Sequence, residues 1–323
     1  MKRKELRRAA LKGDGRAALA LADMLMDAYE EQEAVDVLRA SAAAGAGGVA
    51  LYLAEVLAVS GDEEYERQAE EWYRVAVDEG IPGALNDYGC FLSMHDDRLD
   101  EAEAVLLRAV EARDELSYGN LGGLYLDAER YDEALPWLRR GVAQGNRNLL
   151  PLLSRVETEL GDADAAWEHA RAAIEEDRDG ARLACAVHLA RFGEHHPGLS
   201  AETMFREAAE EDDSAHFLYA NWLKDQGRSG EAEREYRAAI EAGEPNAHLN
   251  FAYLLEDLGR EAEAEAELRA GIAAGDPWAA GGLARFLTDR GRTEEAPDLI
   301  RKAGELGCPQ EEMRELWSMH RSL

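Results

Sequence analysis

Apolar residues recur along the chain at the spacing of an amphipathic helix, in short segments that are separated by glycine or polar turns. Phe251, Leu254 and Leu255 are spaced i, i+3 and i+4, and the same spacing recurs within residues 283–287. Side chains at this spacing lie on one face of a helix. Alanine is abundant and proline is scarce, at 8 residues, which also favours helix. The pattern predicts helices that each bury one face, and no sheet.

The predicted helices belong to an internal repeat. Residues 214–243, 246–275 and 278–307 superpose without a gap at a period of 32 residues. One alanine of the second helix traces this repeat through the whole chain at spacings of 31 to 35 residues. These alanines are Ala34, Ala69, Ala102, Ala134, Ala166, Ala201, Ala232, Ala264 and Ala296. A period of this length is typical of repeat proteins, so we predict nine helix-turn-helix repeats.

Each repeat is predicted to contain two closely packed helices. The second helix carries a small, a large and a small residue, as at Ala232, Tyr236 and Ala239. Small residues let two helix backbones approach, and the large one fills the space between them. Gly243 stands where the helix is expected to end in a left-handed cap, and Pro245 opens the next helix.

Four segments carry a resemblance to known repeat families. QAEEWYRVAVDEG (68–80) and EALPWLRRGVAQG (133–145) resemble the second helix of the Sel-one-like repeat, and LGGLYLDAERYDEA (121–134) and NFAYLLEDLGREAEA (250–264) resemble the first helix and turn of the tetratricopeptide repeat. The resemblance covers about residues 14–307. It implies an all-α fold, a right-handed α-α superhelical solenoid of about nine helix-turn-helix repeats, whose function is to bind other proteins.

Both ends of the repeat array are predicted to be covered by a helix. Residues 1–13 match a second helix, residues 14–307 hold the nine repeats, and residues 308–323 supply one further helix. The ends of a solenoid expose an apolar face unless a cap covers it. We therefore expect one continuous solenoid with two capping helices.

The sequence contains no phosphate-binding glycine loop, nucleophile elbow or paired-histidine zinc helix, so it predicts no enzyme and no cofactor. One cluster gives an alternative. Cys185, His188, His195 and His196 fall within 12 residues of repeat six, and thiolates and imidazoles bind zinc. This cluster makes a metal-binding or hydrolytic protein the alternative hypothesis. However, Cys185 and His188 occupy positions that are apolar in the other repeats, so a core role without metal is preferred.

The resemblance implies a concave groove, lined by first helices, that holds an extended peptide. Asn221 and Asn250 match two asparagines of the family's carboxylate clamp, but the expected cations are replaced by Phe217, Trp278 and Gly282. An asparagine amide offers a peptide backbone both a donor and an acceptor. The candidate groove residues are Asn120, Phe217, Asn221, Asn250, Tyr253, Trp278 and Arg285. The alternative is that these asparagines only hydrate a helix face.

Six tryptophans are present. Four of them fall at helix packing spacing and are expected in the core: Trp72, Trp137, Trp167 and Trp222. Trp278 begins a first helix and is the tryptophan that we assign to the groove.

The formal net charge is −31, with 67 acidic against 36 basic residues, which disfavours binding to nucleic acid. The first twelve residues form a basic arm, which leaves a nucleic-acid-associated regulator as a further alternative.

Three cysteines, an odd number, suggest a reducing compartment, and no apolar run is long enough to span a membrane. The leading prediction is thus a cytoplasmic, non-catalytic scaffold that binds a protein or peptide; its oligomeric state is left open.

Repeat five departs from the repeat pattern. Glu157 and Ala170 replace large apolar residues, and Pro151 falls inside the predicted first helix, where we expect a kink. Because a buried carboxylate needs a partner, Glu157 is expected to reach solvent or an arginine such as Arg147 or Arg155. The repeat is predicted to be a weak seam, or else to pack in a shifted register.

Overall fold

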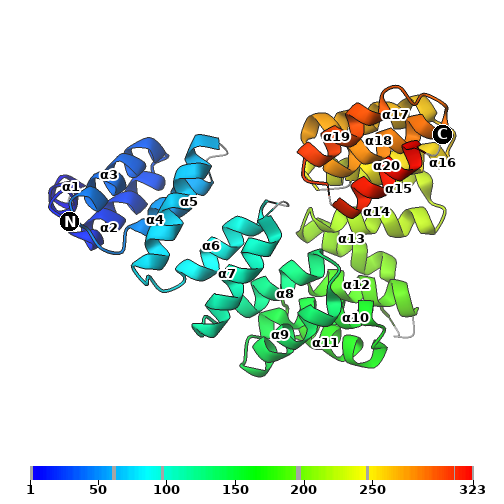
Figure 1. The fold of residues 1–323 in the computed structure, drawn as a ribbon. Helices are drawn as coiled ribbons and strands as arrows, with labels where there is room; N and C mark the ends of the chain where they lie inside the picture. Colours follow the sequence, from blue (N-terminus) through cyan, green and yellow to red (C-terminus); the bar gives the residue numbers. More distant parts are fainter. Residues whose placement is uncertain are drawn as a thin grey trace. The chain divides into compact units, whose positions relative to one another are not determined.

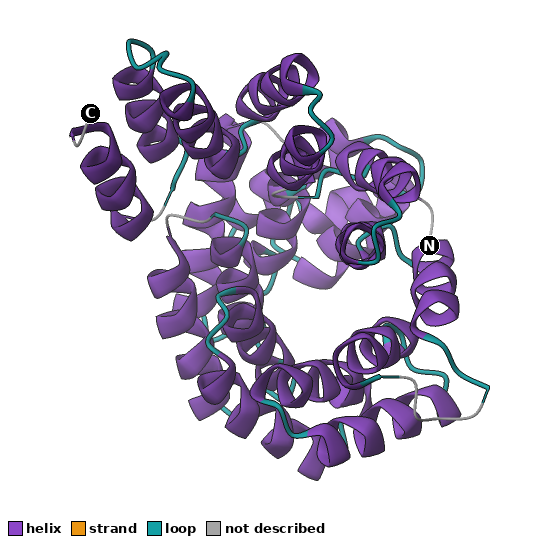
Figure 2. Cartoon of the chain, turned by 90° about the vertical axis from the view of Figure 1, so that its right-hand side faces the viewer, coloured by secondary structure: helices purple, strands orange, loops and turns teal. Residues whose placement is uncertain are grey.

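The computed structural model describes residues 3–59, 63–95, 98–193, 198–244, 247–308 and 310–321. These residues form 20 α-helices and include no strand, which confirms the predicted all-helical solenoid (Figures 1 and 2). The chain divides into two compact units, Met1–Asn146 (unit 1) and Arg147–Leu323 (unit 2), and each is described by itself. The division falls at the start of repeat five.

The helices of unit 1 are α1 (Arg3–Ala10), α2 (Gly15–Met26), α3 (Glu31–Ala43), α4 (Ala50–Ala58), α5 (Glu63–Asp78), α6 (Ala84–Ser93), α7 (Leu99–Glu111), α8 (Ser117–Asp127) and α9 (Tyr131–Ala143). Those of unit 2 are the short 3-10 helix η2 (Arg147–Leu149), α10 (Leu150–Leu160), α11 (Ala163–Glu175), α12 (Ala181–Phe192), α13 (Ala201–Glu211), α14 (Ala215–Asp225), α15 (Ser229–Glu241), α16 (Ala247–Asp257), α17 (Glu261–Ala274), α18 (Pro277–Asp289), α19 (Ala296–Glu305) and α20 (Gln310–Arg321).

Each first helix packs against the second helix of its own repeat, from α2 with α3 to α18 with α19. In unit 2, α10 also contacts α12, and α14, α16, α18 and α20 follow one another in contact. No two second helices are in comparable contact in the described part of this unit. The layer whose helices lie closer together is the inner layer of a curved stack, so the first helices form the inner face of unit 2 (Figure 1).

The two helices of a repeat approach each other where only a small side chain fits. A Cβ atom on Gly122 of α8 would lie 2.3 Å from Leu138 Cδ2 of α9, and one on Gly89 of α6 would lie 2.6 Å from Leu106 Cγ of α7. Both leucines are buried, at 0% and 1% exposure. The large residue of the second helix therefore fills a notch in the first helix, as the small-large-small pattern predicted.

A repeated arginine joins successive second helices. It stands just before the second helix, where it pairs with a glutamate three residues on and with a glutamate of the preceding second helix. Arg130, for example, donates to Glu133 at 2.6 Å and to Glu103 at 2.6 Å. These turn arginines are Arg98, Arg130, Arg228, Arg260 and Arg292. The sequence contains the corresponding signal, an arginine followed by a glutamate at i+3, in each of these repeats.

In repeat five, the structure places Glu157 and Pro151 differently from what the sequence pattern predicted. Glu157 does not reach solvent: it is 0% exposed, and its Oε2 lies 2.6 Å from His169 Nδ1. Arg147 instead pairs with Glu176. Ala170 is fully buried, and α10 packs directly against α12. The weak seam and the shifted register both stay predictions.

Pro151 does not kink its helix. Helix α10 begins at Leu150, so Pro151 lies in the first turn, where no backbone donor is needed. The sequence pattern placed the helix start too early because η2 supplies the residues before it.

The terminal helices bury apolar side chains. Leu6 and Ala10 of α1 are buried, and Leu316 of α20 packs with Ala284 and Ile300. These contacts are what a capping helix requires, although the division into caps and repeats stays a prediction.

Replacing Gly122 by alanine should destabilise unit 1 by about 1–3 kcal/mol, because the new methyl group overlaps Leu138. The matched control is Gly123→Ala in the same helix, where an added Cβ meets nothing within 4 Å. That variant should be neutral or more stable by up to about 1 kcal/mol, because alanine favours helix. Urea unfolding of both variants checks this, and equal effects would contradict the notch.

Arg130→Ala should lower Tm at low salt, and the loss should shrink in 1 M NaCl, where screening is strong. The hydrogen bond from Arg130 lowers the pKa of Glu133 below its ordinary value of 4.5. A lowered acid pKa stabilises the fold above the ordinary value, so the loss should also vanish as the pH falls through the lowered pKa of Glu133. Arg108→Ala, an exposed arginine of α7 without an ion pair among the described residues, is the control. A loss that is independent of salt and pH would refute the ionic contribution.

Candidate binding surfaces

The inner face of unit 2 brings two predicted asparagines together. Asn250 Nδ2 of α16 donates to Asn221 Oδ1 of α14 at 3.4 Å, and the same oxygen accepts from Tyr236 Oη of α15 at 2.6 Å. Both asparagines are half-buried, and Tyr236 is fully buried. The tyrosine therefore fixes the orientation of the Asn221 amide, with its carbonyl directed inward.

The other predicted groove residues of unit 2 extend along the same helices. Arg285 Nη1 of α18 lies 3.4 Å from Tyr253 Oη of α16, so these two positions also meet across neighbouring first helices. The Phe217 ring of α14 contacts the Tyr236 ring edge-on, with centroids 6.5 Å apart. Trp278 is half-buried in the first turn of α18, where its backbone N–H donates to Asp276.

Asn120 lies in unit 1, where it belongs to a different polar cluster. Its Nδ2 on α8 donates to Asn86 Oδ1 of α6 at 2.7 Å, and this oxygen also accepts from Ser117 Oγ at 3.2 Å. Asn86 is buried at 4% exposure. Sequence reasoning missed Asn86, because it occupies a position that the other repeats fill with apolar residues or glycine.

The first helices of unit 1 also carry carboxylates that form no ion pair among the described residues. Burial, and then repulsion from Asp87, raises the pKa of Glu55, and burial raises the pKa of Asp87, with Asp114 adding to it. Burial and a hydrogen bond with Asp23 raise the pKa of Tyr52 to about 12. A shallow cavity of about 290 Å³ lies beside these groups. It is lined by Leu19, Asp23, Gly48, Leu51, Tyr52, Glu55 and Ile81.

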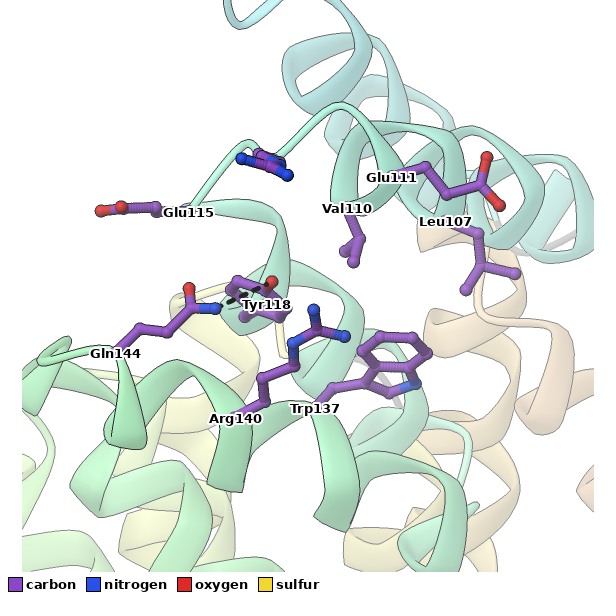
Figure 3. A pocket seen from close by; sticks show the side chains of 9 residues that line it. Leu107, Val110, Glu111, Glu115, Tyr118, Trp137, Arg140 and Gln144 are labelled. Carbon is purple, nitrogen blue, oxygen red and sulfur yellow. Dashed lines mark hydrogen bonds between the residues drawn. The ribbon is translucent and has the colours of Figure 1, made fainter.

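A larger pocket of about 680 Å³ opens between α7, α8 and α9 (Figure 3). We call it the Trp137 pocket. It is lined by Leu107, Val110, Glu111, Arg113, Glu115, Tyr118, Trp137, Arg140 and Gln144. Trp137 was expected in the core, but it is only half-buried and forms one wall of this pocket. Its spacing indicated one packed face, and spacing cannot show whether the rest of an indole is covered.

The cysteine and histidine cluster of repeat six is a packed core where it is described. Cys185 is 0% exposed, and burial raises its pKa to about 11, which disfavours the thiolate that binds metal. The His188 ring packs between Trp167, at 5.5 Å, and Phe192, at 5.1 Å. His195 and His196 lie outside the described residues. Among the described residues, no three histidine, cysteine or acidic side chains are placed to share a metal ion.

The basic arm is partly neutralised. Arg3 pairs with Glu30 and Arg7 with Glu33, so two of its cations already face carboxylates of the first repeat. In the part of the chain that the structure describes, no helix is both long and apolar enough to cross a membrane.

No protein-family model and no curated protein matches the chain. Solved structures do. A protective antigen of uropathogenic Escherichia coli, c5321, which displays an SLR fold, is 19% identical with a TM-score of 0.50, over 99% of this chain and 79% of the antigen. Human IFIT1, as a dimer with PPP-AAAA, is 14% identical with a TM-score of 0.58, over 98% and 84% of the two chains.

A Sel1 repeat protein from Oxalobacter formigenes is 19% identical over 83% of this chain and 90% of its own, with a TM-score of 0.39 that adds nothing to the fold assignment. At these identities the likenesses concern the fold alone. The chain is an α-solenoid of the tetratricopeptide and Sel1-like repeat type, as its sequence predicted.

Asp87→Asn should stabilise unit 1 at pH 7 by about 0.5 kcal/mol, because it removes a half-buried charge that faces Glu55 and Asp114. A raised acid pKa means that the folded chain binds more protons, so stability falls as the pH rises through that pKa. The gain should therefore disappear below the ordinary aspartate value of 3.8. Thermal unfolding from pH 3 to 8 measures it, and a gain that persists at pH 3 would argue against an electrostatic origin.

Proposed function

We propose that the chain is a non-catalytic interaction scaffold whose unit 2 binds an extended peptide segment of a partner protein on the inner face of its first helices. The observation that carries the proposal is the pair Asn221 and Asn250, which neighbouring first helices hold side by side. The repeat fold supports a role in protein interaction in general.

The hydrogen bonds of this pair leave complementary groups for a peptide backbone. Tyr236 donates to the carbonyl oxygen of Asn221, and no described residue accepts from the Asn221 amide nitrogen, which can donate to a peptide. Asn250 donates its nitrogen to Asn221, and no described residue donates to its carbonyl oxygen, which can accept from a peptide. One donor and one acceptor on adjacent helices match the N–H and C=O groups of an extended chain.

Two of the predicted groove residues of unit 2 are aromatic residues in place of cations. Phe217 and Trp278 stand where a carboxylate clamp needs cations, and they offer apolar contacts to peptide side chains instead. The one cation among the predicted groove residues, Arg285, lies beside Tyr253. This composition favours an internal peptide segment over a free C-terminal carboxylate.

Two other functions are less well supported. The IFIT1 structure contains PPP-AAAA, but the likeness extends to the fold only, and a net charge of −31 opposes binding to a polyanion. A metal-dependent activity would need ligands beyond the packed pair Cys185 and His188. The odd number of cysteines supports a cytoplasmic location, which we include in the proposal.

The test uses Asn221→Asp and Asn250→Ala. The aspartate keeps an acceptor for the buried Tyr236 hydroxyl but removes the amide donor, so stability should be retained while peptide binding falls. A partner identified by affinity capture and mass spectrometry is purified and titrated against each variant. We expect each variant to weaken binding about fivefold or more, the scale of one lost hydrogen bond.

Gln226→Ala is the matched control, because it removes an exposed amide at the end of α14, away from the pair. It should bind as the original chain does. If all three variants bind the purified partner equally, the inner face of unit 2 is not the binding surface.

A further inference from the structure

Two arginines, Arg113 and Arg140, line the Trp137 pocket. Arg113 and Arg140 form no ion pair among the described residues, although Glu111 and Glu115 line the same pocket. Figure 3 shows the reason: the carboxylates of Glu111 and Glu115 extend away from the cavity, whereas Arg140 points into it. In a chain with 67 acidic residues, a guanidinium that points into a pocket and has no ion pair among the described residues is suited to an anionic ligand.

The same pocket has an aromatic wall. The rings of Tyr118 and Trp137 are stacked, with centroids 6.5 Å apart and an angle of 28° between their planes. Arg140 Cζ lies 5.5 Å from the centre of the Tyr118 ring, and Val110 faces these groups from α7 (Figure 3). Gln144 Nε2 donates to Tyr118 Oη at 3.3 Å, which fixes the phenol. A flat, half-buried indole beside a guanidinium is a surface on which a further aromatic ring stacks.

Other repeats show that packing does not require this arrangement. The positions of Tyr118 and Trp137 are held by His216 and Glu235 in repeat seven, where Nδ1 and Oε2 lie 2.7 Å apart. In repeat eight they are held by a histidine and a glutamate 2.6 Å apart. There the two side chains satisfy each other, whereas in repeat four they form a wall of an open pocket.

We propose that the Trp137 pocket is a ligand-binding site, separate from the inner face of unit 2, for a planar aromatic group that carries a carboxylate or phosphate. The aromatic ring stacks on Trp137, and the anionic group is bound by Arg140 and Arg113. Leu107 and Val110 form the apolar side of the pocket. The volume of about 680 Å³ lies in the range of small-molecule sites. The aromatic anion is either a free small molecule or an aromatic residue beside an acidic residue in a peptide.

Isothermal titration calorimetry of the full chain tests the proposal. Phenyl phosphate and phenylacetate represent the free aromatic anion, and a capped Asp-Phe dipeptide represents the peptide source. Phenol supplies the aromatic ring without an anionic group, and inorganic phosphate supplies the anionic group without a ring. We expect saturable binding of at least one aromatic anion, and at least tenfold weaker binding of phenol and phosphate. Tighter binding of the dipeptide than of the free anions assigns the peptide source, and the reverse order assigns a small molecule.

Two variants remove one cation each without touching the core. Arg140→Ala changes an exposed residue of α9, and Arg113→Asn suits the left-handed backbone of Arg113, whose φ is 65°. Each should weaken binding about tenfold or more, as the loss of a charge-assisted hydrogen bond does. Arg108→Ala, an exposed arginine of α7 that does not line the pocket, should leave binding unchanged.

Three results would overturn the proposal: no saturable binding of any aromatic anion, equal binding of phenol, or equal binding by the Arg140→Ala and Arg108→Ala variants. Circular dichroism of each variant verifies that the helices are intact. Because the proposed peptide surface lies in unit 2, the Asn221 and Asn250 variants should bind the aromatic anion normally, so the two proposals fail independently.

Discussion

The structure depends on the close approach of the two helices within each repeat, at a point where only alanine or glycine fits. A Cβ at Gly122 would overlap Leu138, and Ala232 beside Tyr236 is fully buried. Because one small and one large residue meet in this way in repeat after repeat, each helix pair has a fixed separation. The next repeat can then stack on the same surface, which is how a solenoid obtains a continuous core from units that are not stable alone.

The high negative charge is distributed unevenly over this framework. On the second helices, turn arginines such as Arg130 and Arg260 bind glutamates of two successive repeats, so much of the acidic charge there is balanced. On the first helices of unit 1, Glu55 and Asp87 form no ion pair with a described residue, and burial raises their pKa values. The second helices are thus joined by ion pairs, while these first-helix carboxylates are not.

The two units offer surfaces of different chemistry. Unit 2 presents the paired Asn221 and Asn250 amides, the surface that we propose for a peptide backbone. Unit 1 presents the Trp137 pocket, where two arginines and a stacked aromatic pair suit an aromatic anion. Repeats of one fold can carry different surfaces, because the side chains outside the helix contacts can vary without changing the helix packing.

The sequence by itself determined the helices, their pairing and the small-residue contacts, because these depend on local periodicity that repeats every 32 residues or so. It also placed Asn221 and Asn250 on neighbouring first helices, because the repeat assigns them to the first helices of two successive repeats. Only the tertiary structure decided that Glu157 is buried against His169 and that Trp137 lines a pocket. Both outcomes depend on which side chains from other helices cover a residue, and the spacing along one helix contains no information about that.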